Sequence, residues 1–82
     1  MGMIYIVENY TTGDTFVCYS AEKAKDYVIK RITQYWNEFE KQYREDDSEL
    51  KEAIAEIEKQ AAQFDGEFDT ERALCYKVPV VE

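Results

Sequence analysis

The first candidates for chemistry are acidic residues that alternate with other residues near the end of the chain. Every second position from 65 to 71 is acidic: Asp65, Glu67, Asp69 and Glu71. Closely spaced carboxylates are ligands that Ca²⁺ prefers, and the spacing is similar to part of an EF-hand loop. However, Gly66 is not where that loop needs its glycine, and no second acidic ligand group follows at the right distance. A solvated acidic turn is the alternative, and we expect neither a metal nor a cofactor.

Nucleophilic catalysis has little support in the composition. The chain has no histidine, so neither a Ser-His nor a Cys-His pair can form. Its three glycines do not form a phosphate-binding loop. Cys18 and Cys75, the only two cysteines, cannot complete a common zinc site without histidine. We interpret them as reduced core thiols, with a disulfide between neighbouring strands as the alternative, and we expect that the protein is not an enzyme.

The distribution of charge is more informative. The 82 residues carry a net charge of −8, which disfavours direct binding to phosphate backbones and favours a basic partner. Segment 38–71 contains 13 acidic and 4 basic residues, a net of −9, whereas the rest of the chain has a net of +1. Such a concentration opposes folding through self-repulsion and exceeds what solubility requires. It indicates either a solvated face or a surface that binds a basic partner.

Three strands are expected from the runs of β-branched and aromatic residues. A β-hairpin is predicted over 3–19, with a turn at 11–14 in which Gly13 is free to take a positive φ. A third strand is predicted over 72–81. Pro79 favours an edge position or a strand end for this segment, because proline cannot donate to a ladder.

Two helices are expected between the hairpin and the third strand. The first is predicted over 21–44, with Ser20 as its N-cap. Its broad apolar arc includes Ala24, Val28, Ile32, Tyr35, Phe39 and Tyr43. The second is predicted over 47–64, ending at Gly66, which suits the left-handed position after a helix. Because the first helix is longer than the strands, its aromatic end needs the second helix as a cover. A single helix over 21–64 is the rival interpretation.

The order of these elements, ββααβ, predicts one α+β domain over 1–82. Its three-stranded, antiparallel-type sheet would carry a helical hairpin on one face. The N-terminus has no basic segment followed by a long apolar run, so we expect no signal peptide, no membrane partner and a cytoplasmic location.

Two short segments carry a resemblance to a known group of proteins. GDTFV at 13–17 leads into Ser20 and a helix, and WNEFE at 36–40 precedes an acidic helix junction. This order is similar to that of a small acidic phage protein of the anti-CRISPR group, which inhibits Cas9 by mimicking DNA. The chain differs in having an N-terminal hairpin instead of an opening helix and a strand after the helices. The resemblance implies that basic residues of a DNA-reading enzyme meet Glu40, Glu45, Asp46, Asp47 and Glu49.

We therefore predict a phage or mobile-element protein that inhibits a nucleic-acid-binding enzyme in the host bacterium by occupying its basic groove. Cas9 is the candidate partner that the resemblance implies, and no direct contact with nucleic acid is expected. The predicted partner-binding residues are Glu40, Glu45, Asp46, Asp47, Glu49, Asp65, Glu67, Asp69 and Glu71. If 65–71 is extended, the last four side chains lie on one face about 7 Å apart.

The alternative is a small structural or assembly protein, so the chain is expected to be a monomer or a homodimer. It would dimerise through aromatic residues of the long helix, with Trp36 and Tyr43 as candidates. Packing of those residues on the second helix of the same chain is the competing interpretation.

Overall fold

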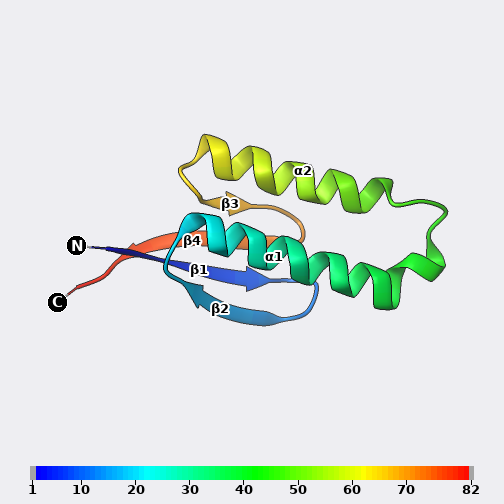
Figure 1. The fold of residues 1–82 in the computed structure, drawn as a ribbon, viewed down its shortest axis with the longest axis horizontal. Coiled ribbons are helices and arrows are strands. Elements are labelled where there is room, and N and C mark those ends of the chain that lie inside the picture. The colour runs from blue at the N-terminus through cyan, green and yellow to red at the C-terminus, as the bar shows by residue number, and fades with distance from the viewer. Residues whose placement is uncertain (1, 82) are drawn as a thin grey trace.

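A computed structural model describes residues 2–81 as a mixed α+β fold with four strands and two α-helices. A π-helical turn, Trp36–Glu40, and a 3₁₀ turn, Lys41–Tyr43, follow the first helix. In chain order the main elements are β1 (Met3–Asn9), β2 (Asp14–Cys18), α1 (Ala21–Tyr35), α2 (Ser48–Gln63), β3 (Phe68–Asp69) and β4 (Ala73–Pro79). Figure 1 shows both helices with the sheet, and the turn that joins them extends beyond the strands.

The sheet is antiparallel with the strand order β2-β1-β4-β3. The prediction of three strands in the order ββααβ is wrong by one strand, because Phe68 and Asp69 pair with Cys75 and Leu74 of β4. We expected an acidic loop there. The Phe68 side chain is buried with the core, and this burial brings the two-residue strand against β4 despite the acidic residues on either side of it.

The two helices are separate, so the rival interpretation of one helix over 21–64 is wrong. At the start of α1, Ser20 Oγ accepts a hydrogen bond of 3.1 Å from the Lys23 N–H, as the sequence predicts. The buried face of α1 consists of Ala24, Val28 and Ile32. The regular helix expected over 21–44 ends at Tyr35, and the π-helical turn shifts the phase of the side chains after it.

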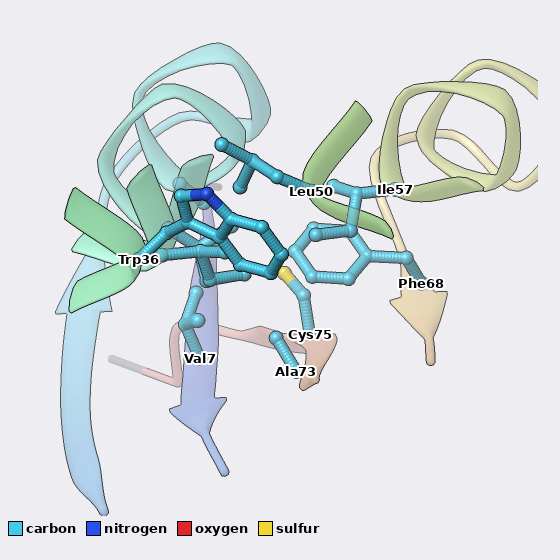
Figure 2. Packing of buried hydrophobic residues seen from close by; sticks show 10 residues of the cluster. Val7, Trp36, Leu50, Ile57, Phe68, Ala73 and Cys75 are labelled. Carbon is cyan, nitrogen blue, oxygen red and sulfur yellow. The ribbon is translucent and has the colours of Figure 1, made fainter. Parts of the chain in front are cut away.

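The core lies between the helices and one face of the sheet. Its buried apolar members are Val7, Ala24, Val28, Ile32, Trp36, Leu50, Ile57, Phe68, Ala73 and Cys75. Figure 2 shows the indole of Trp36 and the ring of Phe68 between the strands and the helical layer, with Leu50 and Ile57 beside them. The second helix covers only part of the predicted aromatic end: Leu50 of α2 joins Trp36 in one cluster, whereas Phe39 and Tyr43 are 54% and 79% exposed.

The sheet order separates the two cysteines. Cys18 lies opposite Tyr5 and Cys75 opposite Val7, so β1 stands between the strands that carry them. Strands two positions apart are about 10 Å apart, whereas the Cα atoms of a disulfide are at most about 7 Å apart. Both cysteines are free thiols, and the disulfide alternative is wrong. Burial raises the pKa of the Cys75 thiol to about 11, which makes it a poor nucleophile at neutral pH.

An ion pair holds the hairpin to α1 and gives a first testable prediction. Arg31 Nη2 lies 2.7 Å from Asp14 Oδ2, and this hydrogen bond is the main cause that lowers the pKa of Asp14. Replacing Arg31 with glutamine is expected to raise the pKa of Asp14 toward the ordinary value of about 3.9. A pH titration of the carboxyl carbon by NMR measures it, with Lys25→Gln, which removes only the contact to Glu22, as the control.

The same pair sets the sign of a pH effect on stability. Because the pKa of Asp14 is lower in the folded than in the unfolded chain, its contribution to stability is present above about pH 4. That contribution is lost as the pH falls through the folded pKa. The free energy of unfolding of Arg31→Gln is therefore expected to fall less steeply with acid than that of the wild type. Equal acid dependence in both proteins would contradict the assigned role of Arg31.

Candidate functional site: an acidic groove

A groove of about 600 Å³ lies between α2 and the turn that joins β3 to β4. We call it the acidic groove, because five of its nine lining residues carry carboxylates. The lining residues are Glu49, Glu52, Ala53, Glu56 and Gln60 of α2 and Asp69, Thr70, Glu71 and Arg72 of the turn region.

One side of α2 supplies three of the groove carboxylates. Glu49, Glu52 and Glu56 follow one another at steps of three and four residues, so they share one face of the helix. Leu50 and Ile57 of the same helix are buried against the core. Burial of that apolar stripe fixes the rotation of α2 and thereby turns its acidic face toward the groove.

The β3–β4 turn forms the opposite wall and is held by hydrogen bonds. Thr70 Oγ1 accepts from the N–H groups of Arg72 and Ala73 at 3.2 and 3.1 Å. Gln60 Oε1 accepts the Asp69 N–H at 2.7 Å, and its Nε2 donates to Glu56 Oε1 at 2.9 Å. Gln60 therefore ties the turn to α2, so the shape of the groove is set before any partner binds.

The one basic residue in the groove lining is already neutralised. Arg72 makes a two-pronged contact with Glu40, with Nη1 2.7 Å from Oε2 and Nη2 3.3 Å from Oε1. Both side chains are about four-fifths buried, and this geometry is the strongest form of an ion pair between arginine and a carboxylate. Among residues 2–81, Glu52, Glu56, Asp69 and Glu71 have no ion-pair partner within 4 Å. The groove is therefore strongly negative.

The structure separates the acidic residues that the resemblance implied. Glu40 points inward to Arg72, and only Glu49 lines the acidic groove. The other three, Glu45, Asp46 and Asp47, line a separate hollow beside Trp36 at the helix junction. There Asp46 Oδ1 accepts the Ser48 N–H at 3.0 Å, and hydrogen bonding by Ser48 lowers the pKa of Asp46. Asp47 pairs with Lys51 at 3.5 Å.

The predicted extended row of acids over 65–71 does not form. Asp65 has a positive φ of 53° and its Oδ2 lies 2.8 Å from Lys77 Nζ. Glu67 turns back to β4, where its Oε2 accepts the Lys77 N–H at 3.0 Å. Only Asp69 and Glu71 of the four line the acidic groove. The reason is that 65–66 and 70–72 are turns, which separate the side chains that a strand would align.

Glu52 and Glu56 are groove residues that the sequence prediction missed. Both lie on the polar side of the predicted second helix, three and seven residues after Glu49. Their spacing of three and seven residues from Glu49 places all three on one face of a helix, and this pattern could have identified them.

Within 2–81, no three His, Cys, Asp or Glu side chains are grouped so as to hold a metal ion. No helix in that range combines the length and apolarity that crossing a membrane requires.

Comparisons of the chain with protein families, curated proteins and solved structures find no match. The arrangement of the side chains is therefore the basis for a functional proposal.

Proposed function

We propose that this protein is a non-enzymatic inhibitor that places its acidic groove against the basic nucleic-acid-binding surface of an enzyme. The observation that supports this proposal most directly is the set of groove carboxylates without a basic neighbour. Carboxylates that served only solubility would be equally effective if dispersed. Gathered around one groove and left unpaired, they attract a basic partner and accelerate its association.

The density of these charges approaches that of nucleic acid. Glu49 and Glu56 are seven residues apart, so these two and Glu52 lie along about 10 Å of α2 at 1.5 Å per residue. With Glu71 from the facing turn, four carboxylates line the groove over about that length, roughly one per 2.5–3 Å, and one of them, Glu49, also pairs with Arg44 at 3.4 Å. Duplex DNA carries about one charge per 1.7 Å of axis, and a single strand of it one per about 3.4 Å. Arg and Lys side chains that bind phosphates can thus meet similarly spaced oxygens.

Charge reversal at the groove is the experiment that tests the proposal. The double variant Glu52→Lys/Glu56→Lys is expected to lower the affinity for the partner at least tenfold, because it replaces two attractive charges with repulsive ones. The matched control is Asp26→Lys/Glu58→Lys, which makes the same change in net charge at exposed helical positions outside the acidic groove. Reversing Asp46 or Asp47 instead would also disturb the helix junction.

The measurement uses immobilised protein and lysate of a bacterial host, followed by titration with the purified captured enzyme. Cas9, which the resemblance implies, is the first purified enzyme to include. Duplex DNA is expected to displace the enzyme, and rising salt is expected to weaken capture, because both act on the same charges. Capture that survives the groove reversal, or that falls equally in the control variant, would contradict the proposal.

A further inference from the structure

The face of the sheet opposite the helices forms a continuous apolar surface, which we call the open sheet face. Side chains alternate along a strand, and Val7 of β1 is in the core, so its neighbours Ile6 and Glu8 lie on the other face. The register aligns Val17, Ile6 and Tyr76 in one row across β2, β1 and β4. The adjacent row contains Ile4 and Val78, and the same alternation places Tyr19 beside Ile4 and puts Val80 one row further along β4.

Several apolar side chains of this face are exposed. Within residues 2–81, both helices pack on the other side of the sheet. Val17 is 51% exposed, Tyr19 82% and Tyr76 39%. Contiguous apolar surface of this kind marks an interaction site.

We propose that the open sheet face binds a second copy of this chain to form a back-to-back dimer. Its charged residues are restricted to one end, where Glu8 and Asp69 flank Leu74. A basic partner is served by the acidic groove, and a net charge of −8 disfavours anionic membrane surfaces. A flat apolar sheet face is complementary to another such face at about 10 Å.

The available area is sufficient for a dimer. Strands about 4.8 Å apart, with residues about 3.4 Å apart, give the face an outline of roughly 400 Å². Side chains standing on that outline expose on the order of 600 Å² per copy, so a dimer buries about 1,200 Å², the lower end of specific interfaces. The acidic groove lies between α2 and the β3–β4 turn, and it therefore stays accessible in both copies.

Charge also selects the orientation of the two copies. A two-fold axis parallel to the strands would bring Glu8 and Asp69 of one copy against the same residues of the other. If the two-fold axis instead lies in the plane of the interface and runs perpendicular to the strands, the end with Glu8 and Asp69 packs against the Val80 end of the second copy. Under this symmetry the central row, Val17–Ile6–Tyr76, lies near the axis and packs against the same row of the second copy.

Analytical ultracentrifugation over a range of concentrations tests the dimer. The wild type is expected to rise with concentration from the monomer mass of 9.7 kDa toward twice that value. Tyr76→Lys is expected to weaken association at least tenfold, because two lysines would be buried near the axis. Tyr43→Lys is the matched control, because Tyr43 is 79% exposed and belongs to the helical segment. Val17→Lys, on a different strand, repeats the test if Tyr76→Lys loses its circular dichroism spectrum.

The response to salt distinguishes dimer formation from binding of the enzyme at the acidic groove. Rising salt is expected to strengthen the dimer, because it screens repulsion between two chains of charge −8, whereas it weakens capture at the acidic groove. A monomer at every concentration and salt would overturn the dimer. So would a dimer that Tyr43→Lys disrupts and Tyr76→Lys leaves intact. Loss of enzyme capture by monomeric Tyr76→Lys, with the wild type also monomeric, would assign the open sheet face to the enzyme.

Discussion

Replacing Trp36 with alanine is expected to lower the free energy of unfolding by about 3–5 kcal/mol. The indole is 2% exposed and joins α1, α2 and the sheet in one core (Figure 2). Its ring centroid also lies 5.9 Å from the guanidinium carbons of both Arg44 and Arg72, a distance at which cations are attracted to the ring. A domain of this size has a total stability of roughly 4–12 kcal/mol, so the variant is expected to be largely unfolded or close to it.

Urea denaturation followed by circular dichroism measures this loss. Tyr43→Ala removes an aromatic side chain that is 79% exposed, and its unfolding free energy is expected to change by less than about 0.5 kcal/mol. Trp36→Phe keeps most of the apolar volume and is expected to lie between the two. A Trp36→Ala protein as stable as Tyr43→Ala would contradict the position of the indole in the core.

The position of Trp36 also bears on the alternative of an assembly protein that dimerises through the long helix. The buried indole is not available to a second chain, so Trp36 cannot serve as a contact residue in that alternative. Tyr43 remains exposed, and the comparison of Tyr43→Lys with Tyr76→Lys therefore distinguishes the helical surface from the open sheet face.

Local signals in the sequence predicted much of the fold. Gly13 takes a φ of 78° in the hairpin turn, and Ser20 caps α1, because each depends on residues only a few positions away. The α+β class with a helical pair on one face follows from the order and periodicity of the segments. Pro79 ends β4, as the missing N–H of proline predicts.

Long-range contacts account for what the sequence did not predict. Strand β3 forms because Phe68 joins the core cluster, whose members Val7, Ile32 and Trp36 are far from it in sequence, although its strand partner Cys75 is only seven residues away. Similarly, Glu40 and Arg72 are 32 residues apart. Their ion pair removes a predicted partner-binding residue from the surface and neutralises the only base in the groove lining.

The sequence predicted that the candidate site is acidic, but it did not predict which acidic residues lie together. The acidic segment was evident from composition, and Glu49, Asp69 and Glu71 do line one groove. Which acids converge depends on the rotation of α2 and on the β3–β4 turn, both of which tertiary packing determines. Glu52 and Glu56 therefore enter the site, whereas Asp65 and Glu67 are held at Lys77.

The end of α2 differs from the prediction in a way that leads to a second large effect. The Gly66 N–H bonds to the Ala61 carbonyl at 2.8 Å, the longer bond of a Schellman motif, so the left-handed position directly after the helix is Asp65. Gly66 follows with a φ of 93° and is buried. A Cβ added there would lie 2.5 Å from Ala21 Cβ and 3.1 Å from a ring carbon of Tyr5. Gly66 thus lets the end of α2 pass close to the start of α1.

Gly66→Ala is therefore expected to lower the free energy of unfolding by about 3 kcal/mol. Backbone strain at positive φ contributes about 1–2 kcal/mol, and the overlap with Ala21 contributes about 1–3 kcal/mol. Gly13→Ala is the matched control, because its φ is 78° and nothing lies within 4 Å of the added Cβ, so only the strain remains. Thermal unfolding is expected to show a loss of about 15 °C for Gly66→Ala and about 5 °C for Gly13→Ala. Equal losses would mean that α1 moves aside without cost, and that the close approach of the helix ends is not a constraint on the fold.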